Sequence, residues 1–326
     1  MILLITLAIT LLLLALFIAI VWLIVRLIGK ARGKKVRYRR FGLTTIVIGS
    51  LWILVALWGN IFGRFRYEVT TWDYVDARLP QSFDGYRIVH ISDAHLEGFE
   101  GHPDFVDTLV NAVNRLHPDL ICFTGDLVSF THEGAKPFLP NLKRLSARDG
   151  VISILGNHDY AIYQRSLDSL EQEADRMELI NIQRNNLSWK LLLNENYTLH
   201  RGTDSLSVIG LENQACGMHQ RVRRGNMAKA MANTEGMFRI LLSHDPSQWD
   251  EEVVGKTDIP LTLSGHTHAM QCRIWSFAPS RWFFRRSDGA YREGDQQLYV
   301  NIGLGELMPF RIGATPEITL ITLRRK

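Results

Sequence analysis

The chain has 326 residues, of which 46% are hydrophobic, and this is enough for a domain with a full hydrophobic core. Its three cysteines, Cys122, Cys216 and Cys272, are too few and too scattered for a disulfide framework or a thiolate zinc site. The net charge of +4 does not indicate a polyanion-binding protein: residues 1–65 hold nine of the 37 basic residues and none of the 33 acidic ones, which leaves 28 minus 33, or −5, for the rest.

Two uncharged segments near the N-terminus predict a transmembrane hairpin. Residues 1–25 carry no charge, and at about 1.5 Å per helical residue they exceed the roughly 30 Å thickness of the hydrocarbon core. Residues 41–63 form a second such segment, with Trp58 and Phe62 near its end, where aromatic rings favour the membrane interface. We expect residues 1–65 to form two spans, at about 3–25 and 42–62. A cleaved signal peptide is disfavoured because its positive charge would precede the apolar segment, whereas here the charge follows it.

The charges between the two spans predict the membrane orientation. Eight basic residues and no acidic one lie there: Arg26, Lys30, Arg32, Lys34, Lys35, Arg37, Arg39 and Arg40. Arg64 and Arg66 alone closely follow the second span. The positive-inside rule therefore places this basic loop in the cytoplasm and the rest of the chain on the extracytoplasmic side. A nucleic-acid patch fits poorly with a position between two spans.

The remainder of the chain alternates short apolar strands with helices, which is typical of an α/β fold. We expect a linker at 66–85 and one α/β domain at 86–326. Strands are predicted at "YRIVHI", "DLICF" and "GVISIL", and a helix at 104–116 ends before Pro118. Because the second half is richer in strands, two sheets are expected.

Several predicted strands end in residues that are able to bind metal: Asp93, His95, Asp126, Asn157, His158, His244, His266 and His268. A lone histidine or a strand-end aspartate is usually structural. In open α/β sheets, however, the functional crevice lies beyond the carboxyl ends of the strands, so residues distant in sequence converge there. His266 and His268 are separated by one residue and are expected to point to the same side.

The side chains in this set predict the kind of metal centre. Without His158 it offers four imidazoles, two carboxylates and an amide oxygen but no thiolate, which suits Mn²⁺, Fe or Zn²⁺. Seven ligands exceed the need of one ion, whereas two divalent ions that share a carboxylate would use them all. Such a pair polarises a phosphoryl oxygen and generates hydroxide near neutral pH, so phosphoester hydrolysis is expected. A single-zinc hydrolase is disfavoured because "GHTH" lacks the H-E-x-x-H spacing.

The segments "SDAH", "TGD", "GNHD", "SHD" and "SGHTH" occur in the order in which the calcineurin-like metallophosphoesterase superfamily carries its D-x-H, G-D, G-N-H, H and G-H-x-H blocks. The chain resembles that superfamily from residue 86 to about 322. The segments "LLLNEN", "YVNIGLG" and "FRIGATPEITLITLR" are similar to its bacterial membrane-associated branch. The resemblance implies a four-layer α/β/β/α sandwich of two mixed sheets, with the site at their shared edge.

The resemblance also implies residue roles. One ion would be held by Asp93, His95 and His268, the other by Asn157, His244 and His266, and Asp126 would bridge them. His158 would act at the leaving group as a general acid or charge stabiliser. The chain departs from the protein-phosphatase branch, which resembles G-D-x-x-D-R-G where this chain has "GDLVSF". Ser129 stands where that branch has a supporting acid, which leaves the partner of His158 open.

Membrane anchorage favours a lipid-linked phosphoester or phosphoanhydride as the substrate. Similarity to enzymes that hydrolyse UDP-2,3-diacylglucosamine makes a pyrophosphohydrolase facing the cytoplasm an alternative, although that side of the membrane conflicts with the predicted orientation. A non-catalytic, membrane-tethered binding protein on the same fold is the rival from another class. It is disfavoured because all seven predicted ligands are present. Residues 281–286, "RWFFRR", either insert into lipid headgroups or pack on the domain.

Overall fold

The computed structural model describes residues 2–33, 38–214 and 222–326, and its strands form two six-stranded sheets. In spatial order, the first sheet contains β1 (Glu68–Asp76), β12 (Glu317–Arg325), β2 (Arg87–Ile91), β3 (Leu120–Phe123), β4 (Val151–Ser153) and β5 (Lys190–Leu191). The second contains β10 (Gly289–Glu293), β11 (Gln296–Val300), β9 (Leu261–Ser264), β8 (Phe238–Leu242), β7 (Asp204–Gly210) and β6 (Glu195–Arg201).

Both sheets are mixed, and each has a parallel block at its centre. Strands β2 to β5 run parallel in the first sheet, whereas β12 pairs antiparallel with β2 and parallel with β1. Strands β7, β8, β9 and β11 run parallel in the second sheet, flanked by antiparallel β6 and β10. The parallel blocks matter for function because their carboxyl ends lie along one edge of each sheet.

The two sheets pack face to face around a shared core. Ile88 of β2 and Ile321 of β12 belong to the same buried cluster as Ile240 of β8 and Leu263 of β9. Because side chains alternate along a strand, the neighbouring Val89 lies on the other face of the first sheet. The alternation assigns one face of each sheet to the other sheet and the opposite face to helices.

Helices cover the outer faces. On the first sheet they are α3 (Pro103–Arg115), α4 (Leu139–Leu142) and α5 (Ser169–Asn181). Helix α3 buries Val106, Leu109, Val110 and Val113, which are spaced as one face of an α-helix requires. The second sheet is covered more thinly, by α6 (Met227–Ala230) and by residues of the 249–253 turn. The predicted α/β/β/α sandwich of two mixed sheets is confirmed.

Strand β1 corrects the predicted linker. Residues 66–85 were expected to connect the hairpin to the domain, but Glu68–Asp76 pairs with all nine residues of β12 as an edge strand. Tyr74 of this strand is fully buried, whereas most of its other side chains are half-buried or exposed. The strand was missed because an edge strand carries little of the continuous apolar character that identifies the buried strands.

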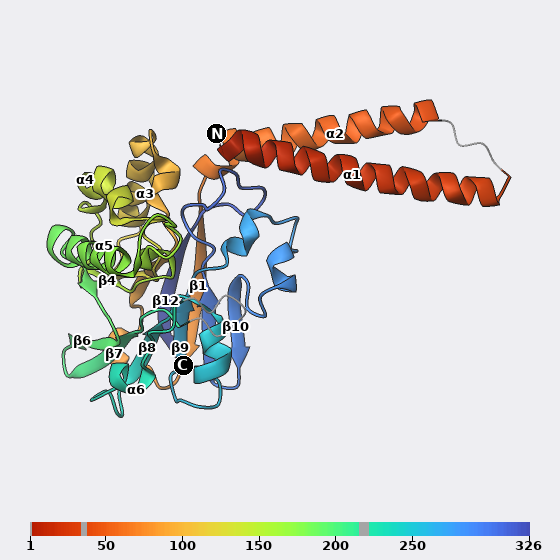
Figure 1. Cartoon of the computed structure of the whole chain (residues 1–326). Helices are drawn as coiled ribbons and strands as arrows, with labels where there is room; N and C mark the ends of the chain where they lie inside the picture. Colours follow the sequence, from red (N-terminus) through yellow and green to blue (C-terminus); the bar gives the residue numbers. More distant parts are fainter. Residues whose placement is uncertain (1, 34–37, 215–221) are drawn as a thin grey trace.

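Two long helices, α1 (Ile2–Ala31) and α2 (Tyr38–Ile61), form a hairpin that leaves the domain at one edge and extends away from it (Figure 1). Leu14–Ala31 and Gly42–Phe65 are long and apolar enough to cross a membrane, with mean hydropathies of 2.2 and 2.0. Almost none of their surface is buried by the rest of the protein. Part of the predicted basic loop, residues 34–37, lies outside the described residues.

The end of α2 contacts the segment just before β12. The amide of Arg311 donates to the carbonyl of Gly59 at 3.1 Å, and the side chain of Asn60 donates to the carbonyl of Pro309. The guanidinium of Arg64 pairs with the carboxylate of Glu306 at 2.6 Å. Gly63 is required here because a Cβ would lie 2.1 Å from the carbonyl oxygen of Arg311. The hairpin is thus joined to the loop that reaches the candidate site.

Candidate metal centre

The predicted site residues all follow the carboxyl ends of parallel strands. Asp93 and His95 follow β2, Asp126 follows β3, Asn157 and His158 follow β4, His244 follows β8, and His266 and His268 follow β9. Both sheets therefore contribute to one site at their common edge, and all eight residues meet there. Among the described residues, two groups of acidic and imidazole side chains have the geometry to hold a metal ion.

The first group consists of Asp93, His95 and His268, all buried. The Nε2 atoms of His95 and His268 lie 3.1 Å apart. Oδ1 of Asp93 lies 3.3 Å from Nε2 of His268 and 4.0 Å from Nε2 of His95. Three ligand atoms thus converge on one point, with no thiolate among them.

The second group consists of Asp126, His244 and His266, with Asn157 beside it. Nε2 of His244 lies 3.2 Å from Oδ2 of Asp126 and 3.0 Å from Oδ1 of Asn157. The side-chain amide of Asn157 donates at 2.9 Å to the hydroxyl of Tyr163, which turns its Oδ1 toward His244. The rings of His244 and His266 meet edge to face, with centroids 5.1 Å apart.

Asp126 lies between the two groups. Its Oδ2 is 3.2 Å from Nε2 of His244 in the second group and 3.6 Å from Nε2 of His95 in the first. Its Oδ1 accepts the backbone N–H of His158 at 2.8 Å, which fixes the plane of the carboxylate. One carboxylate oxygen therefore faces an imidazole nitrogen from each group.

Unusual backbone conformations aim these side chains. Five site residues have positive φ, namely Asp93, His95, Asp126, His266 and His268. Such conformations cost free energy in residues other than glycine and persist where the surrounding structure enforces them. Neighbouring glycines allow the loops to approach closely: a Cβ on Gly156 would lie 2.2 Å from Oδ1 of Asp126, and one on Gly265 would lie 2.3 Å from Oδ2 of Asp93.

Burial sets the protonation states of the first group. Burial lowers the pKa of His95 to about 3. Burial also lowers the pKa of His268 well below its ordinary value, and the neighbouring His95 ring and Arg311 guanidinium add to that shift. Both rings are therefore neutral near pH 7, which leaves a nitrogen lone pair on each for a metal. Burial raises the pKa of Asp93 to about 7, and the neighbouring Asp126 carboxylate adds to that shift. Two buried carboxylates this close favour a cation between them.

The buried Asp126 carboxylate of the second group also favours a positive charge beside it. Burial opposes ionisation of Asp126, yet the imidazoles of His244 and His158 hold its pKa below the ordinary range. Burial would lower the pKa of His244, but the adjacent Asp126 carboxylate raises it to about 10. Buried oxygen and imidazole donors that face one another without thiolates fit divalent cations such as Mn²⁺, Fe and Zn²⁺.

Several supporting groups were not predicted. The Nδ1–H of His244 donates at 2.7 Å to the carbonyl of Thr124, which leaves Nε2 facing the site. The guanidinium of the fully buried Arg311 lies 3.2 Å from Nδ1 of His268 and donates to the carbonyls of Gly305 and Ala314. Backbone acceptors carry no sequence signal, and Arg311 is a lone arginine in a segment without a metal-ligand pattern.

Asp159 shapes the loop that carries the central carboxylate. Its Oδ2 accepts the backbone N–H groups of Asp126 and Gly156 at 2.8 and 2.9 Å, and its Oδ1 accepts that of Leu127 at 2.8 Å. The carboxylate therefore ties the loop after β3 to the loop after β4.

His158 lies beside the two groups rather than within them. Its Nδ1–H donates at 2.8 Å to the backbone carbonyl of Ser129, because a carbonyl oxygen can only accept. Its ring stacks on Tyr163 at 4.1 Å and meets the ring of His95 edge to face at 4.9 Å. The partner of His158, which the sequence left open, is thus the backbone carbonyl of Ser129, the residue that stands where the protein-phosphatase branch has a supporting acid.

The site opens to solvent beside His266, which is the least buried of the seven predicted ligands. Its side chain is 16% exposed, and its ring meets that of Phe284 edge to face, with centroids 5.7 Å apart. Phe284 belongs to the 281–286 segment, so this segment borders the opening.

The family follows from a comparison with known domains. The model of the calcineurin-like phosphoesterase family matches residues 86–270. The chain belongs to this family. Members of this family are metal-dependent phosphoesterases, so the predicted enzyme class is confirmed.

Several related proteins match most of the length of this chain. The uncharacterized metallophosphoesterase YkuE of Bacillus subtilis is 30% identical over 82% of this chain and 91% of its own length. A "transmembrane protein with metallophosphoesterase domain" of Danio rerio is 31% identical over 86% of this chain, which spans 63% of that relative. The UDP-2,3-diacylglucosamine pyrophosphatase LpxG of Chlamydia muridarum is 28% identical over 86% of this chain and 95% of its own length.

Proposed function

We propose that this chain is a membrane-anchored phosphoesterase that uses two divalent ions to hydrolyse a phosphoester or phosphoanhydride of a lipid-linked substrate. The observation that carries the proposal is the position of Asp126, whose Oδ2 faces His95 of one group and His244 of the other. Asp93, His95 and His268 would hold one ion, and Asn157, His244 and His266 the other. Asp126 would bridge them.

In this proposal the protein's own residues position the ions and the substrate. Two divalent ions bound there would polarise the phosphoryl oxygen and bring the pKa of a water molecule near neutrality. The strained loops hold the carboxylates and imidazoles in place before substrate binds, so little reorganisation is needed during the reaction. The opening beside His266 admits the phosphoryl group.

His158 completes the chemistry in the same proposal. With Nδ1–H committed to the carbonyl of Ser129, the remaining nitrogen, Nε2, is the atom that exchanges a proton. It would protonate the oxygen of the departing alcohol, which leaves poorly as an alkoxide. This function requires no acidic partner for His158, since the carbonyl already fixes the orientation of the ring.

Membrane placement rests on the two apolar helices and on charge asymmetry. The basic residues between the helices favour a cytoplasmic loop, which would leave the catalytic domain outside the cytoplasm. The similarity to LpxG favours a second candidate, pyrophosphohydrolysis of a UDP-diacylglucosamine-type substrate by a domain that faces the cytoplasm. The two candidates differ in orientation, which can be measured directly.

The test of the metal centre combines activity with metal content. Purified full-length protein with Mn²⁺ should hydrolyse 4-nitrophenyl phosphate or bis(4-nitrophenyl) phosphate. Asp126→Ala should abolish hydrolysis and lower the bound metal from two ions per chain to one or none. His132→Ala is the matched control, because His132 also pairs with a carboxylate, that of Asp175, but lies outside both groups. Full activity of Asp126→Ala after its metal is removed would refute the proposal.

A further inference from the structure

A cluster of large apolar side chains is exposed between β9 and β10. It consists of Ile274, Trp275, Phe277, Trp282 and Phe283, which we call the aromatic surface. Trp275 is 94% exposed and Trp282 is 74% exposed, and the rings of Phe277 and Trp282 lie 5.2 Å apart. An exposed cluster of apolar side chains of this kind marks a site that interacts with a membrane, a ligand or another protein.

The aromatic surface lies next to the membrane-proximal end of α2. Ile274 and Phe277 close a tight turn with two backbone hydrogen bonds of 2.8 and 3.0 Å. The preceding Arg273 donates its amide to the carbonyl of Ile312 at 2.8 Å, and the 311–312 segment is bonded to Gly59 of α2. Figure 1 shows the segment before β10 on the side of the domain from which the hairpin extends. A bilayer around the hairpin would therefore face this turn.

Trp275, the exposed aromatic residue of this turn, has a backbone conformation that costs free energy. Trp275 has a φ of 54°, in the left-handed region that glycine or asparagine usually occupies in turns. A bulky residue in this conformation, almost wholly exposed, contributes nothing to the core of the domain. An observed backbone outlier of this kind is a reason to look for a binding role.

The charges nearby indicate what kind of contact is made. The exposed Arg281 pairs with Asp288 at 3.3 Å, and the exposed Arg285 pairs with Asp250 at 3.5 Å. Asp288 also pairs with Arg273, and Asp250 also pairs with Arg286, which in turn pairs with Glu293. Because four guanidinium groups thus meet three carboxylates, little net charge remains, and the aromatic rings rather than net positive charge would drive association. A zwitterionic lipid interface fits such a surface, because Trp and Phe partition there without a charge requirement.

The same segment connects the aromatic surface to the candidate site. Trp282 and Phe283 are exposed, whereas the next residue, Phe284, packs against His266 at the opening of the site. A phosphoryl group attached to a lipid in the bilayer would thus reach the opening along the 282–284 segment.

We propose that the aromatic surface inserts into the interfacial region of the bilayer around the hairpin, and that the substrate is a phosphoester borne on a membrane lipid that enters the site beside His266. The inference rests on the proposed membrane anchorage and phosphoesterase function and adds the route of the substrate. It also resolves the two interpretations of "RWFFRR": the segment packs on the domain through Phe284 and meets lipid through Trp282 and Phe283.

The first experiment measures insertion without any catalysis. In the full-length protein, Cys216 and Cys272 are replaced by serine, whereas Cys122 is kept because it is buried. An environment-sensitive fluorophore is then attached to a new cysteine, Ser276→Cys, between Trp275 and Phe277. In phosphatidylcholine nanodiscs, nitroxide-labelled lipid should quench this fluorophore strongly. The same fluorophore at Leu170→Cys, an exposed position at the start of α5 on the opposite side of the domain, should not be quenched (Figure 1).

The second experiment measures delivery of substrate. Methyl and hexadecyl 4-nitrophenyl phosphate share one reaction, in which water adds to phosphorus and the bond to 4-nitrophenolate breaks, but only the hexadecyl ester resides in the nanodisc. Trp275→Ser with Trp282→Ser should lower the ratio of hexadecyl to methyl kcat/KM by about 10-fold, because the lost apolar burial weakens interfacial contact. Leu170→Ser should leave the ratio unchanged, as should replacing phosphatidylcholine by phosphatidylglycerol.

The outcomes separate this inference from the proposed function. Equal quenching at positions 276 and 170 would overturn the inference even if both esters are cleaved, and so would cross-linking between copies through position 276 in place of quenching. Failure to cleave either ester would count against the proposed function, and the quenching experiment would still decide whether the surface meets lipid.

Discussion

At the scale of single residues, His158 differs from the other histidines of the site in how its ring is held. His95, His244 and His268 direct Nε2 toward a carboxylate or another imidazole. His158 contacts the centre through its backbone N–H, which donates to Asp126, while its ring is fixed by the carbonyl of Ser129. Removing its side chain should therefore affect catalysis without removing a metal ligand.

His158→Gln should leave metal content unchanged but lower kcat by roughly 10²-fold to 10⁴-fold for substrates with an alkyl leaving group, because general-acid help is lost. The loss should be much smaller for 4-nitrophenyl esters, whose leaving group needs no proton. The measurement is a comparison of kcat for alkyl and 4-nitrophenyl esters, with metal analysis of both proteins. Equal losses for both classes of ester would contradict a role at the leaving group.

The side chains of the site could be predicted from the sequence, whereas the backbone groups that support them could not. Asp93, Asp126 and the His266–His268 pair follow apolar strands at spacings that the family shares, and the structure brings them together. The carbonyls of Thr124 and Ser129 are set by loop conformation and leave no mark in the sequence. Arg311 could be located only after folding, since its contacts run to carbonyls in segments 302–305 and 314.

At the scale of elements, the loop between β11 and β12 links α2 to the candidate site. Glu306 of this loop pairs with Arg64, which lies just after the end of α2, and Gly305 of the same loop donates its amide to the carbonyl of Asp93 at 2.8 Å. The Glu306 side chain is almost completely buried. Burial raises its pKa from 4.5 to about 7, although Arg64 opposes the shift.

Glu306 should make stability depend on pH. Because its folded-state pKa exceeds the unfolded value, its contribution is fully present below about pH 4.5 and is lost as the pH rises through about 7. The loss is on the order of 3 kcal/mol in unfolding free energy, since each pKa unit corresponds to about 1.4 kcal/mol. Thermal unfolding of the full-length protein across this pH range should show a decrease that Glu306→Gln makes smaller.

Arg64→Gln is the matched control for that experiment. It removes the cation that opposes the shift, so the decrease of stability between pH 4.5 and 7 should become steeper. A decrease of the same size in the wild type and in Glu306→Gln would show that the ion pair, rather than burial, governs the carboxyl group.

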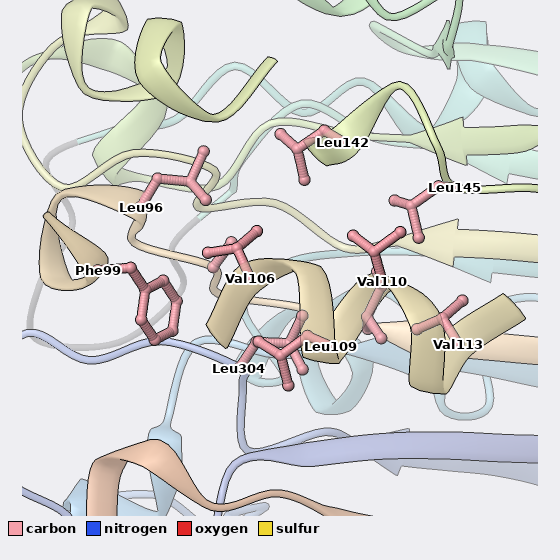
Figure 2. A pocket seen from close by; sticks show the side chains of 11 residues that line it. Leu96, Phe99, Val106, Leu109, Val110, Val113, Leu142, Leu145 and Leu304 are labelled. Atoms are coloured by element: carbon pink, nitrogen blue, oxygen red, sulfur yellow. The ribbon is translucent and has the colours of Figure 1, made fainter. Parts of the chain in front are cut away.

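Helix α3 packs over a small apolar cavity against the first sheet. The cavity, of about 30 Å³, is lined by side chains that include Val106, Leu109 and Val110 of α3, Leu96 and Leu304 (Figure 2). Its lining offers no polar partners that a water molecule would need, so it should be dry. An added methyl group at its wall is expected to gain contacts.

Val110→Ile should fill part of this cavity and raise the unfolding free energy by about 0.8 kcal/mol, the value of one buried methylene. Val89→Ile, at a fully buried β2 position that does not line the cavity, should lower it by roughly 1–3 kcal/mol through overpacking. Thermal or denaturant unfolding of both variants measures the difference, and equal effects of the two substitutions would argue against the cavity.

Sequence patterns identified the buried elements better than the peripheral ones. The strands β2, β3 and β4 are buried on both faces almost throughout, and most of their residues are apolar. Edge strand β1 was assigned to a linker because only one of its side chains, that of Tyr74, is buried. Its assignment depends on pairing with β12, a contact between residues that lie more than 240 positions apart.

At the scale of the whole molecule, orientation in the membrane separates the two candidate substrates. The charge asymmetry predicts that the catalytic domain is outside the cytoplasm. A cysteine introduced at Leu170, which is exposed on α5, should react with a membrane-impermeant maleimide in intact cells. Labelling of this position only after the cells are lysed would reverse the orientation and favour the cytoplasmic pyrophosphohydrolase.

The position of β12 has a consequence for how the protein is made. This strand lies between β1 and β2, so the first sheet stays open until residues 317–325 have been synthesised. By then both apolar helices have long left the ribosome. The first sheet would therefore be incomplete while the helices are inserted, and an incompletely folded domain is what a narrow protein-conducting channel requires if the chain is to pass through it.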